Sequence, residues 1–386
     1  MDFRMGDESD AFRQEVREFL AEQMTPELEE KLYRTGTNHD EAFTKAVADR
    51  GWLALRWPVE WGGQGRHPLE AIAYNEEIQR VDGPSYGMGT TMMIAKVVHE
   101  LGTDEQKAEI LRPALRGEII ICLGLSEPEA GSDVANAQTR AVRDGDEWVI
   151  NGQKMFTTNA HIGDYVFLLA RTNTDVAKHK GLTTFLVPLK HPGVEVQAVF
   201  TMSGERTNIT YYSDVHIPDA WRIGDVDGGW RVMTVFLQDE HSTGFASHLA
   251  RLIHHTEAWA ASATDAEGRR RIDDPEVRAR LARAATDLEV SRLLQRRSVW
   301  IAATGVVPEA EGPMAKLYSS EALERAAQDL TELVGADALR SYFDPTAPEG
   351  GRIEHTLRFS LGTTIYAGTS EVQRNIIAQR GLGLPR

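Results

Sequence analysis

A glutamate in the second half of the chain is a candidate general base. Glu240 lies in the segment Phe236-Leu237-Gln238-Asp239-Glu240-His241. If this segment is helical, Phe236, Glu240, Thr243 and Gly244 share one face of the helix. A carboxylate among small and apolar neighbours is a stronger base than one in water, because desolvation raises its pKa. A solvated glutamate is nevertheless the common case on a helix, so the position alone does not assign this role.

A polar turn in the middle of the chain combines acidic, hydroxyl and glycine residues. It reads Leu125-Ser126-Glu127-Pro128-Glu129-Ala130-Gly131-Ser132-Asp133. Gly131 permits a close approach of the backbone to a ligand, and small hydroxyl side chains stand beside it. The turn suits the edge of a ring system and an extended arm, although an ordinary surface turn has a similar composition.

Cysteine and histidine form no pattern typical of a reactive or metal site. The single cysteine, Cys122, lies in an apolar run, and we expect a buried core thiol. His254 and His255 are adjacent and would point to different faces of a helix, and no His-x-x-x-His pair encloses a helical glutamate. We predict no metal site. Glycine-rich nucleotide-binding fingerprints and phosphate loops are also absent from the sequence.

The pattern along the chain changes from helices to strands and back to helices. Apolar residues recur at helical spacing in the first hundred residues, and long Pro-free stretches return after Gly228-Gly229. Between them, short runs rich in β-branched and aromatic residues favour an antiparallel sheet, because no helices intervene. The expected strands are 148–150, 165–170, 182–187, 194–200 and 208–215. The expected later helices are 231–261, 275–304, 314–333 and 371–380.

We therefore predict an α+β multidomain fold for these 386 residues. It has an N-terminal helical domain (1–118), a middle antiparallel β-barrel or sandwich (119–222) and a C-terminal domain like a four-helix bundle (223–386). The formal net charge of −16 argues against nucleic acid as a partner. The sequence shows no secretory signal and no apolar run of the ~20 residues that cross a bilayer, so we expect a cytoplasmic protein.

Five segments together resemble the acyl-CoA dehydrogenase family, from about residue 10 onward. They are Trp61-Gly62-Gly63-Gln64-Gly65, Gly102-Thr103-Asp104-Glu105-Gln106-Lys107, the polar turn, Asn151-Gly152-Gln153-Lys154-Met155-Phe156-Thr157-Thr158-Asn159 and Tyr366-Ala367-Gly368-Thr369-Ser370-Glu371-Val372-Gln373-Arg374. The resemblance implies FAD-dependent α,β-dehydrogenation of an acyl-CoA thioester. A base removes the α-proton while the β-hydrogen leaves as hydride to flavin N5, and electrons pass to an electron-transfer flavoprotein.

The resemblance also assigns roles to individual residues. Phe156 stands where the family usually has a tryptophan that packs on the flavin, and Thr158 would bond near N5 and O4. Ser132 would lie beside the CoA chain. Phe236 and Gly244 would also contact the substrate. The residues assigned to FAD are Leu125, Ser126, Phe156, Thr157, Thr158, Thr369 and Glu371.

The catalytic base is the residue on which this chain differs from many relatives. Many members carry the base in the closing motif, where this chain has Ala367, which cannot accept a proton. A second group carries a glutamate about ten residues past a Gly-Trp pair, and counting from Gly229-Trp230 leads to Glu240. Asp239 is the alternative if the register is shifted. The backbone N–H of Ala367 would donate to the thioester oxygen.

Two segments that bind FAD in ordinary homotetrameric members of the family are missing from this chain. The corresponding segments here are 261–268, without the usual arginine, and 331–339, without the glycine-rich loop. Loss of an arginine that pairs with a diphosphate weakens the grip on FAD. The resemblance therefore points to an α2β2 hetero-oligomer with a second acyl-CoA dehydrogenase-like chain, as in steroid side-chain degradation by actinobacteria.

Three functions remain open at this point. The first is a catalytic subunit that desaturates an acyl-CoA, including a steroid or other bulky side-chain CoA. The second is a non-catalytic partner subunit of a heteromeric acyl-CoA dehydrogenase. The third is a dehydrogenase in biosynthesis that acts on an acyl-carrier-protein thioester.

Overall fold

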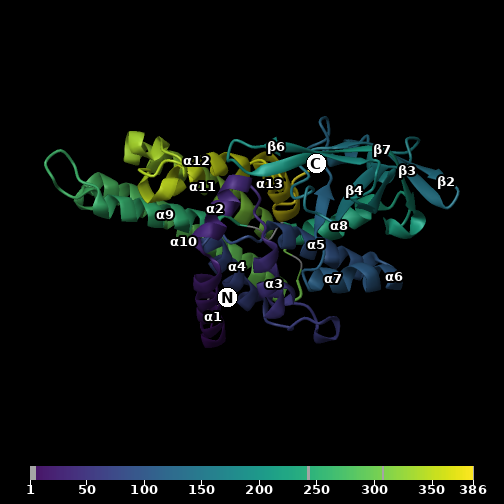
Figure 1. Cartoon of the computed structure of the whole chain (residues 1–386), viewed down its shortest axis with the longest axis horizontal. Helices are drawn as coiled ribbons and strands as arrows, with labels where there is room; N and C mark the ends of the chain where they lie inside the picture. The colour runs from purple at the N-terminus through teal and green to yellow at the C-terminus, as the bar shows by residue number, and fades with distance from the viewer. Residues whose placement is uncertain (1–5, 241–243, 307, 386) are drawn as a thin grey trace. The chain divides into compact units, whose positions relative to one another are not determined.

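The computed structural model (Figure 1) contains two units. It describes residues 6–240, 244–306 and 308–385, without the side chains of 238–240. The helical unit comprises Met1–Ala21, His67–Asp82 and His241–Arg386, and the sheet unit comprises Glu22–Arg66 and Gly83–Glu240. The predicted fold class, with helices, then a sheet, then helices, is confirmed. The limits of the three domains stay a prediction.

Several of the N-terminal helices begin at residues that cap them. Pro68 follows His67, whose ring accepts the Leu69 N–H at 3.2 Å, while Glu70 accepts the His67 N–H in return. The same reciprocal arrangement joins Thr103 and Gln106. The helices are α1 (Asp7–Gln23), α2 (Pro26–Thr35), α3 (Glu41–Asp49), α4 (Pro68–Arg80), α5 (Tyr86–Leu101), α6 (Asp104–Gln106) and α7 (Arg112–Leu115).

One eight-stranded sheet forms the centre of the sheet unit. Its order is β6-β7-β3-β2-β4-β5-β8, and β1 pairs with β4. Most neighbours are antiparallel, as expected, but β1 runs parallel to β4, and β2 meets β4 in parallel at one register pair. The strands are β1 (Ile121–Gly124), β2 (Arg140–Asp144), β3 (Glu147–Lys154), β4 (Tyr165–Arg171), β5 (Leu182–Pro188), β6 (Val194–Phe200), β7 (Arg206–Pro218) and β8 (Arg222–Ile223).

The sheet is buried on both faces at β4 and β5. Phe167 and Leu186 belong to one apolar cluster, and Leu168 and Phe185 to another. Because both faces of β4 and β5 are covered, these strands are buried along almost their whole length without alternation, and the buried residues of β5 include Thr183 and Thr184. Cys122 lies in the second cluster, as predicted, and burial raises the pKa of its thiol to about 12. It is therefore a core residue.

The C-terminal helices pack into one bundle, with α4 alongside (Figure 1). Their core is a single cluster that includes Leu252, Leu281, Leu323 and Phe359. The helices of this region are α9 (Ala246–Ser262), α10 (Pro275–Ala303), α11 (Glu311–Val334), α12 (Arg352–Thr363) and α13 (Ser370–Ile376). Among the described residues, no helix is long and apolar enough to cross a membrane.

The helix predicted over 231–261 is interrupted, which corrects the expectation of one continuous face. Helix α8 (Gly229–Glu240) ends before Gly244 and Phe245, which lie outside both α8 and α9. The Phe245 N–H donates to the Ser319 hydroxyl at 3.1 Å, so it is not part of a helical ladder. Helical spacing therefore does not place Gly244 on the same face as Phe236.

Candidate active site

The polar turn that follows β1 is held by a buried ion pair. Lys154, at the end of β3, is 0% exposed and donates to Glu127 Oε1 at 2.7 Å and to the Leu125 carbonyl at 3.1 Å. The Glu127 carboxylate also accepts the backbone N–H groups of Gln138 and Thr139, at 2.6 and 2.9 Å. These four contacts fix the start of the turn against the end of β3.

Both members of this pair carry their charges at neutral pH. Burial lowers the pKa of Lys154 to about 8, although the neighbouring carboxylate opposes that shift. Burial also disfavours the charged form of Glu127, but the Lys154 ammonium and the two N–H donors outweigh it and hold the pKa of Glu127 below its usual value. The ion pair is therefore intact under ordinary conditions.

An exposed aromatic ring lies directly beyond this ion pair. The Met155 N–H donates to the Ser126 carbonyl at 2.8 Å, which ties the segment to the polar turn. Phe156 has φ +58° and is 59% exposed. A left-handed backbone conformation costs free energy for a residue with a Cβ. Because the ring is largely exposed, its burial offsets little of that free energy. Phe156 thus presents a flat apolar surface that packing within the sheet unit does not explain.

The two threonines that follow Phe156 have different surroundings. Thr157 is buried, with its hydroxyl 3.2 Å from that of Thr210 and its N–H bonded to the Asn208 carbonyl at 2.8 Å. Thr158 is exposed, and its hydroxyl lies 3.1 Å from that of Thr207. Thr157 therefore supports the segment, while Thr158 offers an accessible hydroxyl.

A network of hydrogen bonds supports this segment, and it was not predicted from the sequence. The Asn208 side chain donates to the Thr157 carbonyl at 3.0 Å and lies 3.3 Å from His161 Nδ1. His161 Nε2 in turn lies 3.0 Å from the Thr37 hydroxyl. Burial, followed by the charge of Arg206, lowers the pKa of His161 to about 4, so its ring is neutral at pH 7. No motif marks these residues, because they are separated by about 40 to 120 positions in the chain.

The structure describes the remaining predicted residues of the sheet unit unevenly. Leu125 and Ser126 are half-buried at the start of the polar turn, and Ser132 is exposed near its end. Phe236 is 1% exposed and packs on Phe167 with ring centroids 6.1 Å apart, so it is a core residue. Glu240 is the last residue of α8, and its side chain lies outside the described part of the structure. Thr243 and His241 also lie outside it.

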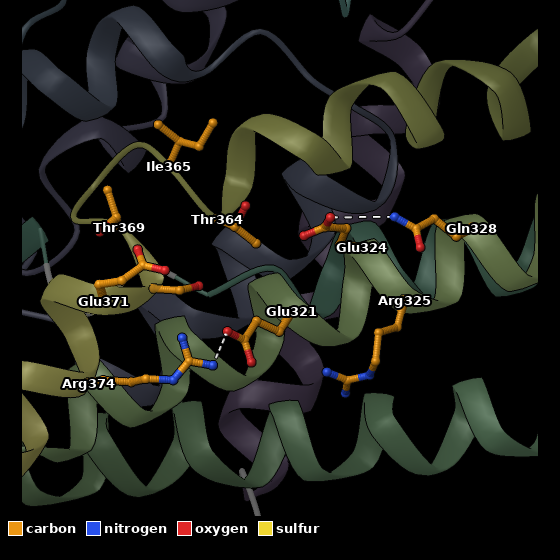
Figure 2. Close-up of a pocket in the computed structure, with 10 residues that line it drawn as sticks. Glu321, Glu324, Arg325, Gln328, Thr364, Ile365, Thr369, Glu371 and Arg374 are labelled. Atoms are coloured by element: carbon orange, nitrogen blue, oxygen red, sulfur yellow. Dashed lines mark hydrogen bonds and ion pairs between the residues drawn. The ribbon is translucent and has the colours of Figure 1, made fainter.

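In the helical unit, the closing segment borders a polar pocket of about 510 Å³ (Figure 2). Figure 2 shows Arg374 and Glu321 facing one another, and their side chains pair at 2.6 Å. Both predicted residues of this segment, Thr369 and Glu371, line the pocket, and the Thr369 hydroxyl caps α13 by accepting the Val372 N–H at 3.2 Å. The lining is Glu321, Glu324, Arg325, Gln328, Thr364, Ile365, Thr369, Ser370, Glu371 and Arg374.

Ala367 lies in the loop between α12 and α13, in a left-handed conformation with φ +53°. Its methyl side chain cannot accept a proton, and its carbonyl accepts the Gln373 side-chain amide at 2.8 Å. This position therefore offers only backbone groups for chemistry.

Comparisons with known proteins identify the family. The acyl-CoA dehydrogenase N-terminal domain matches residues 6–118, the middle domain 122–216 and the C-terminal domain 227–382. The chain belongs to the acyl-CoA dehydrogenase family, whose members are FAD-dependent oxidoreductases. The resemblance noted from the sequence is confirmed.

Several relatives are similar to the chain over almost its full length. Acyl-CoA dehydrogenase FadE26 of Mycobacterium tuberculosis is 36% identical, with 98% of each chain covered, and FadE29 of the same organism is 33% identical, with 96% covered. Among solved structures, the ChsE4–ChsE5 complex from Mycobacterium tuberculosis matches with a TM-score of 0.92 at 36% identity. The Tcur3481–Tcur3483 steroid ACAD matches with a TM-score of 0.91 at 33% identity. Both structural matches cover 100% of each chain.

The described residues fit the cofactor of this family. An exposed, strained Phe156 gives a flat wall for a ring system, and Thr158 places an accessible hydroxyl two residues further on. Ser126 is joined to this wall through the Met155 N–H. A metal ion is not suggested, since no group of three or more suitable side chains occurs among the residues that the structure describes.

Proposed function

We propose that the chain catalyses α,β-dehydrogenation of an acyl-CoA thioester, with Glu240 as the base. The proposal is carried by the closing loop, where Ala367 supplies a backbone N–H but no carboxylate. The base must then come from another segment, and α8 ends at Glu240, ten residues past Trp230. FAD, when bound, supplies a hydride acceptor for the β-hydrogen.

The residues of this chain handle the proton and the developing charge. The Glu240 carboxylate takes the α-proton, and the electron pair of the broken C–H bond moves toward the thioester carbonyl. The Ala367 N–H donates to that oxygen and stabilises its growing negative charge. Phe156 and Thr158 would hold the flavin ring, with Leu125 and Ser126 at its edge. Thr369 and Glu371 would contact FAD from the helical unit.

We further propose a bulky substrate and an unlike partner chain. A relative of known structure is described as a steroid ACAD, and the ChsE4–ChsE5 structure is a complex of two chains. In the segment after α9, Arg269 pairs with Asp265 at 2.8 Å and Arg270 with Asp273 at 3.1 Å. Exposed pairs of this kind are weak, and the support for a missing diphosphate ligand is the absence of an arginine from 261–268. A second acyl-CoA dehydrogenase-like chain in an α2β2 assembly would supply it, and an electron-transfer flavoprotein would accept the electrons.

The test is co-expression with a second acyl-CoA dehydrogenase-like chain encoded in the same genome, followed by turnover with an artificial electron acceptor. A panel of straight-chain, branched and steroid thioesters, each on CoA and on acyl-carrier protein, identifies the substrate and the carrier. We expect the Glu240→Gln complex to keep its yellow flavin and to lose at least about 10²-fold of kcat, because the general base is removed. The matched control, Asp239→Asn, removes the neighbouring carboxylate and should keep most of the activity.

The missing FAD grip favours a second candidate, in which this chain is a non-catalytic partner subunit. In that case Glu240→Gln and Asp239→Asn would both leave turnover unchanged, and the corresponding base of the other chain would be essential. That result would contradict the proposed function.

A further inference from the structure

The loop between α12 and α13 presents backbone N–H groups in a strained conformation. Ala367 and Gly368 both have positive φ, +53° and +82°. Such a conformation is rare for alanine and persists only where surrounding contacts hold it. Within the described residues, no group accepts the Ala367 N–H, whereas the preceding Tyr366 N–H is bonded to the Gly362 carbonyl at 3.1 Å. The Gly368 and Thr369 N–H groups likewise have no acceptor among the described residues, so the loop keeps three successive donors available, and the Ala367 N–H is the first of them.

Two fully buried side chains hold the carbonyl groups that follow this donor. The Gln373 amide donates to the Ala367 carbonyl at 2.8 Å, and the Lys316 ammonium donates to the Gly368 carbonyl at 2.6 Å. Both side chains are 0% exposed. A Cβ at position 368 would lie 2.6 Å from the Gln373 amide nitrogen, so this grip requires a glycine there. The two peptide units that follow Ala367, 367–368 and 368–369, are thus anchored.

The start of α13 does not need these contacts. Thr369 caps the helix through its hydroxyl, and its carbonyl accepts the Gln373 N–H at 2.9 Å. Gln373 Oε1 is buried without a partner among the described residues, which is a cost that an apolar side chain would avoid. The helix does not need the Gln373 amide, and the contact that accounts for this amide is its hydrogen bond to the Ala367 carbonyl.

We propose that Gln373 and Lys316 are positioning residues that hold the Ala367 N–H toward the thioester oxygen of the substrate. A donor that is fixed before the reaction stabilises a developing oxyanion without reorganisation. Neither side chain touches the substrate, and both act through the backbone of residues 367 and 368. This inference rests on the proposed function.

The experiment compares Gln373→Met with the wild-type complex, using the thioester turned over fastest in the panel and its α-deuterated form. We expect kcat per bound flavin to fall about 10- to 100-fold, less than the loss on removing such a donor outright, with KM changed by less than about threefold. The α-deuterium isotope effect on kcat should rise, because cleavage of the α C–H bond becomes slower. Lys316→Met should act in the same direction.

Gln373→Glu gives a pH readout that a purely structural role would not. A buried carboxyl can donate to the Ala367 carbonyl only when it is protonated, so the ratio of variant to wild-type kcat should rise as the pH falls. The matched control is Gln106→Met, since Gln106 is also buried and donates to two backbone carbonyls, those of Ala220 and Arg222. It should lower the melting temperature and leave the isotope effect unchanged.

The outcomes separate this inference from the proposed function. If the wild-type complex turns over a thioester and Gln373→Met has the same kcat per flavin and the same isotope effect, the positioning role is wrong. If the wild-type complex turns over no thioester of the panel, the proposed function itself is wrong.

Discussion

At the scale of single residues, the Lys154–Glu127 pair holds the polar turn in place, and the loss of one partner should cost more free energy than the loss of both. Both charges are buried, so an intact pair contributes little net free energy, while either partner alone is costly. Lys154 also bonds the Leu125 carbonyl, so the pair holds the turn that the site is built on.

Replacing one partner should therefore be much worse than replacing both. We expect Lys154→Met to reduce the free energy of unfolding by about 3–5 kcal/mol, because it leaves an unpaired buried carboxylate. Adding Glu127→Gln should recover a large part of that loss, because the amide is neutral. The control is Lys45→Met, which breaks an exposed pair with Asp49 and should cost less than about 1 kcal/mol. Urea unfolding measures all three, and a single variant no worse than Lys45→Met would refute the argument.

The half-buried His161, which is joined to the Phe156 segment through Asn208, should make the sheet unit sensitive to acid. The pKa of His161 is about 4 in the folded protein against an ordinary 6.5, so between these values the unfolded chain binds the extra proton. The stabilising effect of the neutral ring is complete above pH 6.5 and is lost as the pH falls toward 4. His161→Asn should therefore show a smaller loss of unfolding free energy between pH 7 and pH 4.5 than the wild type. Urea unfolding at the two pH values measures this loss, and an equal loss in the variant and the wild type would contradict the prediction.

At the scale of elements, Gly36 joins the end of α2 to β7. It has φ +62°, and its carbonyl accepts the Arg206 N–H at 2.7 Å. A Cβ there would lie 2.3 Å from the Gly204 carbonyl oxygen, so the two backbones could not stay as close as they are. The glycine is required by both the backbone angle and the contact.

Gly36→Ala should destabilise the protein by more than the angle alone requires. We expect a loss above about 2 kcal/mol in unfolding free energy, because the left-handed angle costs about 1 kcal/mol and the clash adds to it. Gly268→Ala is the matched control, with φ +79° and no atom within 4 Å of the added Cβ. Equal losses in the two variants, measured by thermal unfolding, would show that the contact with Gly204 does not matter.

The elements differ in how well the sequence predicted them. Strands β4, β5 and β6 lie within one residue of their predicted positions, because apolar runs or flanking turn residues delimit them. The short strands β1, β2 and β8 were not predicted, since two to five residues carry little periodicity. Helix α2 was not predicted, although Thr25 and Pro26 mark its start and Leu28, Leu32 and Tyr33 lie on one face of it. The break before Phe245 depends on the Ser319 hydroxyl, which lies 74 positions away.

At the scale of the whole molecule, the family and the fold could be predicted, but the supports of the site could not. Motifs placed Phe156, Thr158 and Ala367 because each belongs to a local segment with a characteristic composition. Lys316 and Asn208 lie about 50 positions from the loops that they hold, and nothing near them in the sequence shows that they do so. Contacts of this kind arise only when distant segments pack together.

The absence of the two FAD-binding segments leads to a prediction about assembly. Expressed alone, the chain should retain little FAD after gel filtration, whereas co-expression with the partner chain should yield a flavin-loaded complex. The physical reason is that the segment 261–268 contains no arginine, so a diphosphate needs a ligand from elsewhere. The ratio of flavin absorbance to protein absorbance measures this. A fully loaded homo-oligomer would contradict the assembly that we propose.

The most direct test of the central claim, that Glu240 removes the α-proton, is anaerobic mixing of the flavin-loaded complex with its acyl-CoA substrate in a stopped-flow spectrophotometer. The account predicts that the visible flavin absorbance of the wild type bleaches rapidly. Glu240→Gln should bind the same thioester but bleach at least about 10²-fold more slowly, because the proton has no acceptor. Bleaching of the Glu240→Gln complex at the wild-type rate would contradict the account.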